Sequence, residues 1–230
     1  MLEPALSFFS DPQAIARYTE APVRLVPGFH ALQRMAVLLL TEAVPANGRV
    51  LVLGAGSGLE LKAFADAQPL WHFVGVDPSA EMLELAKTTL GPLASRVELH
   101  EGYIHTAPEG PFDGATCLLT LHFLAAEDRL HTLTELGRRL KPGAPLVVAH
   151  LSFPQSAVEK ARWLDRYAAF AVASGVPEAN AKSAATAIGR RLPLLTPEQD
   201  VALLQDAGFS GDELFYAGFT FKGWIAYKPA

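Results

Sequence analysis

The segment Val50-Leu51-Val52-Leu53-Gly54-Ala55-Gly56-Ser57-Gly58 decides the fold class, because an unbroken apolar run ends directly in alternating glycines. A continuous apolar run is typical of a parallel strand that is covered on both faces. Glycine lets the chain turn sharply, and a helical pattern follows from Leu59 to Ala67. A strand-to-helix turn of this kind presents backbone N–H groups to a polar or anionic ligand. The candidate binding residues of the turn are Gly54, Ala55, Gly56 and Gly58, and the alternative is a tight turn without a ligand.

An acid at the end of the next predicted strand is the second feature. Asp77 closes the apolar segment that starts at Trp71, and it follows Gly54 by about twenty residues. An acid at this spacing accepts hydrogen bonds from the hydroxyls of a ribose. It also suits the position before a helix that begins at Ser79, and the two roles are compatible. The turn and the acid together predict an adenosine-type ligand, either a dinucleotide or S-adenosylmethionine.

Strand-like and helix-like segments continue to alternate after this point. The predicted strands are Trp71–Asp77, Val97–His100, Ala115–Thr120 and Leu146–Leu151, and the predicted helices between them are Ser79–Leu90 and Glu127–Leu140. Such alternation is typical of right-handed βαβ units in an open, mostly parallel sheet. We therefore predict an α/β fold.

Both ends of the chain depart from this alternation. The predicted segments there are a helical cap over residues 1–45 with a turn at Pro27-Gly28, a helical insertion over residues 155–195 that is a possible lid, a short helix from Thr196, and an antiparallel hairpin of Glu213–Tyr216 and Thr220–Tyr227. No linker or repeat separates them from the rest. We expect a single domain over residues 1–230.

Composition and charge narrow the function classes. The chain has 230 residues and a formal net charge of −5, so it lacks the basic excess of proteins that bind nucleic-acid backbones. Cys117 is the only cysteine, which excludes an intramolecular disulfide and a cysteine-based zinc cluster, and we predict no metal site. The apolar runs are too short to cross a bilayer and the first residues lack a secretory signal. We expect a cytoplasmic protein without membrane contact, and leave a homodimer open.

Three features favour S-adenosylmethionine over a dinucleotide. The spacing Gly54-x-Gly56-x-Gly58 differs from the G-x-G-x-x-G turn that surrounds a pyrophosphate. Asp77-Pro78-Ser79, followed by Met82, looks like the adenosine-binding turn of class I methyltransferases. The segment Leu140-Lys141-Pro142-Gly143-Ala144 resembles the "LKPGG" segment of the same enzymes.

With these residues the chain resembles the class I S-adenosylmethionine-dependent methyltransferases from about residue 15 to its end. It is similar in particular to the tRNA wobble-uridine carboxymethyltransferases of the CmoA type. The segments that carry this finer likeness are Arg24–Phe29, Thr120–Leu124, Asp206–Phe209 and Glu213–Tyr216. The resemblance implies a Rossmann-like fold, with a mostly parallel seven-stranded sheet, helices on both faces and an antiparallel strand at one edge.

The resemblance also implies where a cofactor would lie. Gly54, Ala55 and Gly56 would lie under the methionine part, and Asp77 would hold the ribose. The residues expected around the adenine or on the floor are Pro78, Met82, Gly102, Tyr103, Ile104, Leu118 and Leu119. The N-terminal helices would close over the site with Tyr18, Arg24 and Phe29, and Arg24 is a candidate partner for the cofactor carboxylate, with an exposed surface arginine as the alternative.

The chain departs from the family pattern at several positions. Val52 stands where the first strand usually carries an acid, and Tyr103 stands where an acid usually follows Gly102. Ala187 aligns with the arginine that would recognise a carboxylated cofactor. These departures favour ordinary S-adenosylmethionine as the cofactor, and they keep a non-enzymatic cofactor-binding relative open.

The expected activity is methyl transfer to a small-molecule acceptor, with a tRNA-modifying enzyme as the alternative. Methyl transfer needs mainly correct positioning of the acceptor, because the sulfonium is already a good electrophile. His122, just past the fourth predicted strand, is the candidate catalytic base. The alternative for His122 is a packing role at the turn that follows the strand.

Overall fold

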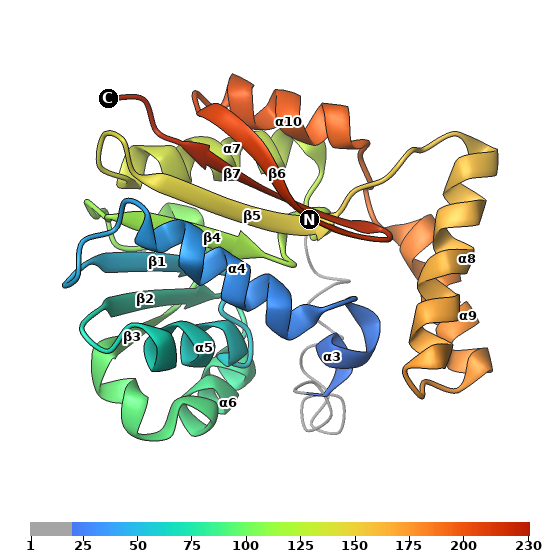
Figure 1. Cartoon of the computed structure of the whole chain (residues 1–230), viewed down its shortest axis with the longest axis horizontal. Helices are drawn as coiled ribbons and strands as arrows, with labels where there is room; N and C mark the ends of the chain where they lie inside the picture. The colour runs from blue at the N-terminus through green and yellow to red at the C-terminus, as the bar shows by residue number, and fades with distance from the viewer. Residues whose placement is uncertain (1–19) are drawn as a thin grey trace.

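The computed structural model describes residues 20–230 of the chain (Figure 1). Tyr18 lies outside the described residues, as does the first part of the predicted cap over residues 1–45. In the described part, seven strands form one sheet in the order β3-β2-β1-β4-β5-β7-β6. The strands are β1 (Arg49–Leu53), β2 (His72–Asp77), β3 (Val97–Glu101), β4 (Gly114–Leu118), β5 (Pro145–Leu151), β6 (Ser210–Gly218) and β7 (Phe221–Tyr227).

The sheet is mostly parallel, which confirms the predicted fold class. Strands β1 to β5 pair in parallel, whereas β7 pairs antiparallel with β5 on one side and with β6 on the other. The antiparallel strand β7 therefore lies one place in from the edge, and β6 forms the edge itself. Because β1, β2 and β4 are neighbours that run in the same direction, the turns that follow them meet at one end of the sheet.

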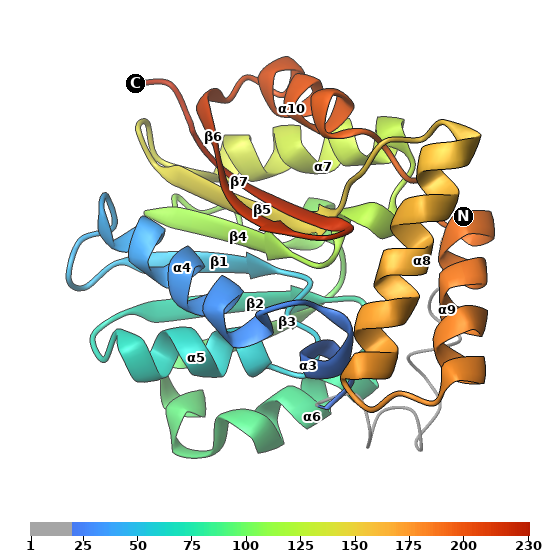
Figure 2. The ribbon, with the colours of Figure 1, turned by 45° about the vertical axis from the view of Figure 1, so that its right-hand side comes forward.

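Helices cover both faces of the sheet (Figures 1 and 2). One face carries α4 (Phe29–Thr41), α5 (Leu59–Ala67) and α6 (Ala80–Leu90), and the other carries α7 (Ala126–Arg139) and α10 (Pro197–Asp206). The side chains of β1 alternate between two hydrophobic clusters, with Val50 and Val52 in one and Leu51 and Leu53 in the other. A strand buried on both sides needs this continuous apolar run.

Local capping explains where two of the predicted helices begin. The side chain of Ser79 accepts a hydrogen bond from the N–H of Met82 at 3.2 Å, which starts α6. Thr196 and Gln199 form a reciprocal capping box that starts α10. The strand ends differ from the prediction by up to three residues, most in β6, which spans Ser210–Gly218 rather than Glu213–Tyr216. Strand β4 stops at Leu118 rather than at Thr120, because Leu119 has a left-handed φ of 57° that takes the chain out of the sheet.

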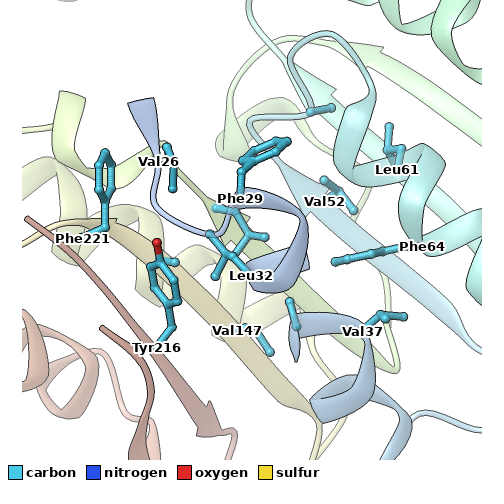
Figure 3. Close-up of a cluster of buried hydrophobic side chains, with 14 of the residues drawn as sticks. Val26, Phe29, Leu32, Val37, Val52, Leu61, Phe64, Val147, Tyr216 and Phe221 are labelled. Atoms are coloured by element: carbon cyan, nitrogen blue, oxygen red, sulfur yellow. The ribbon is translucent and has the colours of Figure 1, made fainter. Parts of the chain in front are cut away.

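Most of the remaining elements lie around the end of the sheet where the strands finish. They are α3 (Ala21–Leu25), α8 (Ala157–Ala173), α9 (Glu178–Arg191) and the short 3-10 helices η3 (Ile104–Thr106) and η4 (Leu121–Phe123). The 3-10 helix η2 (Gly91–Arg96) lies at the opposite end, where Arg96 donates to the carbonyls of Ala65 and Trp71 just before β2. Helices α8 and α9 stand side by side at the end where the strands finish (Figure 2), and α8 contacts α3. The hydroxyl of Tyr216 donates to the carbonyl of Pro27 at 2.6 Å, which fastens the α3–α4 turn to the hairpin. Figure 3 shows Tyr216 among the surrounding apolar side chains, with Phe221 above it and Leu32 beside it.

Candidate functional site

Two adjoining cavities lie at the carboxyl ends of β1, β2 and β4. The larger cavity has a volume of about 460 Å³ and the smaller one about 70 Å³. Four residues line both of them, namely Gly54, Gly56, Leu119 and Thr120. The glycine turn therefore forms a common wall between two compartments. Ligands of open α/β sheets bind in this location, beyond the carboxyl ends of the strands.

Glycine is sterically required at both ends of the turn. Gly54 has a φ of +78°, and a Cβ atom there would lie 2.0 Å from the hydroxyl oxygen of Thr120. Gly58 has the same φ, and its Cβ would lie 2.9 Å from the Cα of Ala86 in α6. Glycine at position 54 therefore avoids a collision with Thr120 in the cavity wall. Glycine at position 58 lets α5 approach α6.

Asp77 is held rigidly against the glycine turn. Its two carboxylate oxygens accept hydrogen bonds from the backbone N–H of Gly56 at 2.9 Å and of Ser79 at 3.0 Å. Burial raises the pKa of Asp77, and the two backbone hydrogen bonds oppose that shift. The side chain lines the larger cavity. Because each carboxylate oxygen has a second lone pair, Asp77 can still accept hydrogen bonds from a ligand's hydroxyls.

The larger cavity brings together most of the residues that were predicted to surround a nucleoside. The predicted residues that line it are Gly54, Gly56, Asp77, Pro78, Met82, Gly102, Tyr103, Ile104 and Leu119. The ring of Tyr103 stacks on that of His105, with 5.8 Å between the ring centroids. The far wall was not predicted. It is formed by Phe123 of η4, Leu124 directly after it, and Asp128, His131 and Thr132 of α7.

The smaller cavity lies on the other side of the turn, under the N-terminal helices. Its lining includes Ala55 and Leu118, which were predicted, and Phe29, which was expected to close over the site. Glu60, in the first turn of α5, was not singled out by the sequence and also lines it. Glu60 is 8% exposed, and the hydroxyl of Thr116 donates to its carboxyl group. Burial raises the pKa of Glu60 to about 8, although this hydrogen bond lowers it.

Leu119 holds a strained conformation between the two cavities. Its positive φ is uncommon for a residue with a branched side chain. The backbone N–H donates to the carbonyl of Ala149 at 2.5 Å, which keeps the residue attached to β5 as it leaves the sheet. Strain of this kind costs about 1–3 kcal/mol and concentrates at functional sites. With this conformation, Leu119 and Thr120 line the floor of both compartments.

Three predicted site residues line neither cavity, namely Gly58, Arg24 and His122. Arg24 is about half exposed and pairs with Glu20 at 3.2 Å, so the structure gives it the surface position that was the alternative. His122 is buried, and its Nδ1 accepts the N–H of Leu151 at 3.5 Å. Burial, together with the nearby His150 and Arg129, holds the pKa of His122 well below its ordinary value. Its placement favours the packing role over that of a base.

The helical insertion and the charges around the site restrict its chemistry. Helices α8 and α9 line neither cavity, and no lysine or arginine is found among the described lining residues.

Over residues 20–230, no cluster of three or more His, Cys, Asp or Glu side chains could hold a metal ion. In the same range, no helix combines the length and the apolar character that crossing a membrane requires.

Comparisons with known proteins agree with this geometry. Residues 50–143 match the family described as "Methyltransferase domain". A carboxy-S-adenosyl-L-methionine synthase from Chromohalobacter salexigens is 27% identical, over 100% of this chain and 86% of that protein, which confirms the resemblance to the CmoA type.

Solved structures show the same fold. An O-methyltransferase family protein from Burkholderia thailandensis superposes with a TM-score of 0.71 at 17% identity, and human N-acetylserotonin methyltransferase in complex with SAM superposes with a TM-score of 0.65 at 16% identity. Each match covers 97% of this chain, but the chain spans only 62% and 58% of the length of these two proteins.

Proposed function

We propose that this chain, a class I S-adenosylmethionine-dependent methyltransferase by its domain match and fold, transfers the methyl group of ordinary S-adenosylmethionine to a small-molecule acceptor. One observation carries the proposal. The glycine turn divides the site into two compartments, the carboxyl side chains of Asp77 and Glu60 line one each, and no lysine or arginine is found among the described lining residues. Such a site suits a cationic ligand that has a nucleoside at one end.

The described residues fit this cofactor. The turn at Gly54 forms a cradle that a Cβ atom would fill, and Asp77 retains free acceptor sites in the larger compartment. Asp77 would hold the ribose, and Pro78, Met82 and Tyr103 would surround the adenine. When bound, the cofactor supplies an electrophilic methyl group. The protein's own contribution is to orient the acceptor near Leu119 and Thr120 and to exclude water, because alignment supplies much of the acceleration of such a reaction.

A small acceptor is favoured over a nucleic acid by charge. The net charge of −5 opposes binding to a polyanion. The described lining residues also include no lysine or arginine that could hold a phosphate backbone. The acceptor would approach the floor residues that both compartments share.

Synthesis of a carboxylated S-adenosylmethionine is the second candidate, because the relative from Chromohalobacter salexigens bears that name and matches over the whole chain. A carboxylated cofactor needs a cation beside its extra carboxylate, and the described lining residues include no lysine or arginine. The geometry therefore supports methyl transfer better.

Two measurements test the proposal. Mass spectrometry of copurifying ligands and calorimetric titration are expected to reveal S-adenosylmethionine or S-adenosylhomocysteine. A methyl-labelled cofactor, offered together with a fractionated metabolite extract and with total tRNA, should label a metabolite fraction. The absence of binding at millimolar ligand would refute the proposal. Labelled tRNA would show that the acceptor is a nucleic acid rather than a small molecule. A carboxylated product would favour the second candidate.

A further inference from the structure

Glu60 is a buried acid without a cationic partner in the described part of the chain. It is the second residue of α5, and its side chain reaches across to β4, where the hydroxyl of Thr116 donates to it. No lysine, arginine or histidine forms an ion pair with it over residues 20–230. An ionised carboxylate accepts about four hydrogen bonds, so one hydroxyl leaves most of its capacity unused.

The surroundings of Glu60 make its charged form unfavourable in the free protein. Burial raises its pKa to about 8, so the carboxyl group is mostly neutral at pH 7. The groups that face it from the packed elements carry no positive charge. Gln33 of α4 lines the same cavity and is neutral, and burial raises the pKa of the Cys117 thiol on β4, which keeps that group protonated. A cation that enters the cavity would therefore ionise Glu60.

The geometry of the turn identifies the cation. Asp77 occupies the nucleoside compartment and accepts the N–H of Gly56, while Glu60 lines the compartment on the other side of the same turn. A ligand whose adenosine lies on Asp77 extends its amino-acid end across the turn, and that end carries an ammonium group. We infer that Glu60 binds the α-ammonium group of the methionine part of the cofactor. The inference rests on the proposed function.

The position of Glu60 also accounts for a departure from the family pattern. Thr116 is the register partner of Val52, the strand residue that stands in place of an acid. By accepting a hydrogen bond from Thr116, Glu60 brings a carboxyl group from the helix to the neighbourhood of that strand position. The acid missing from β1 is thus replaced from α5.

Calorimetric titration of the full chain with three ligands tests the inference. S-adenosylmethionine and S-adenosylhomocysteine carry the ammonium group, whereas 5′-methylthioadenosine lacks the whole amino-acid end. Because a hydrogen-bonded ion pair is lost, Glu60→Gln should weaken binding of the first two by about tenfold or more and leave 5′-methylthioadenosine within about twofold. The third ligand also shows that the variant is folded.

Glu81→Gln is the matched control. Glu81 is likewise the second residue of its helix, α6, but its side chain is exposed and lines neither cavity. Both variants replace a carboxyl group with an amide in the first turn of a helix, so the chemical change is the same. Glu81→Gln should bind all three ligands as the unmodified protein does.

Proton release gives a readout that does not depend on the variant. At pH 7 the neutral Glu60 must lose a proton when it pairs with the ammonium group, so the apparent heat of S-adenosylhomocysteine binding should change with the ionisation enthalpy of the buffer. Binding of 5′-methylthioadenosine should release no such proton. An absence of proton release, or an equal loss for all three ligands in Glu60→Gln, would overturn the inference. If the unmodified protein binds none of the three, the proposed function itself fails.

Discussion

Two consecutive strand–turn–helix units form the site, and each supplies one acid in a different way. In the β2–α6 unit the acid is Asp77, at the strand end, and two backbone N–H groups hold it. In the β1–α5 unit the acid is Glu60, in the first turn of the helix, and a single side-chain hydroxyl holds it. Burial raises the pKa of both acids. Asp77 is therefore already organised for a ligand's hydroxyl groups, whereas Glu60 becomes stable as an anion only when a cation binds beside it.

The largest expected effect comes from forcing the two units apart. Gly58→Ala puts a Cβ atom 2.9 Å from the backbone of Ala86 at a φ of +78°, so α5 must move away from α6. The combined strain and overpacking should lower the free energy of unfolding by about 3–4 kcal/mol, measured by urea denaturation. Gly143→Ala is the control, because Gly143 has a φ of +74° but open space around it, and it should cost only about 1 kcal/mol. Equal losses in the two variants would show that the close approach at Gly58 is unimportant.

The next effect concerns the pH dependence of stability in the ligand-free protein. The unfolded chain loses the proton of Glu60 near pH 4.5, whereas the folded protein keeps it until about pH 8. Between these values the folded state binds one more proton, so the free energy of unfolding should fall by roughly 1.4 kcal/mol per pH unit. From pH 5.5 to 7.5 this amounts to about 2.8 kcal/mol, and Glu60→Gln should remove it. Asp77 contributes equally to both proteins, so parallel pH profiles would refute the burial of a protonated Glu60.

A smaller effect is expected from Asp77→Asn. An amide has one acceptor oxygen, so it cannot accept both the Gly56 and the Ser79 N–H groups and a ribose as well. Affinity should fall by about thirtyfold for every adenosine ligand, including 5′-methylthioadenosine, by calorimetry. Asp66→Asn, at an exposed ion pair with Lys62, is the control and should have no effect. A loss restricted to ligands with an amino-acid end would mean that the roles of the two acids are exchanged.

The smallest effect is expected at His122. In His122→Gln the amide oxygen can accept the N–H of Leu151 in place of Nδ1, and the side chain lines neither cavity. Affinity for S-adenosylhomocysteine and the rate of label transfer should stay within about twofold. A loss of rate by a factor of about one hundred, with unchanged affinity, would restore His122 as the base.

The sequence predicted the parts of the site whose residues are close together along the chain. The run Val50–Leu53, the glycines after it and Asp77 lie within two adjacent units, and their spacing alone indicates an adenosine site. Glu60 was missed because an acid in the first turn of a helix is normally an exposed residue that interacts with the helix dipole. Its burial depends on Thr116, 56 residues away, which spacing does not reveal.

The insertion and the far wall were harder to predict for the same reason. Helices α8 and α9 were recognised as helices, but only the packing of α8 on α3 shows that they leave both cavities unlined. Asp128 and His131 line the larger cavity because α7 packs against η3, the short helix that follows β3. Periodicity identifies a helix, whereas its neighbours depend on the order of strands in the sheet.

The hydrogen bond from Tyr216 to Pro27 has a consequence for how the protein is made. It joins residues that are 189 positions apart, and it fastens the turn between α3 and α4, two helices that line the smaller cavity, to a strand that the ribosome produces much later. Contacts between such distant residues form late, because closing a long loop costs entropy before any contact compensates for it. A nascent chain can therefore assemble the glycine turn and Asp77 first, and it gains a complete amino-acid compartment only after β6 has emerged.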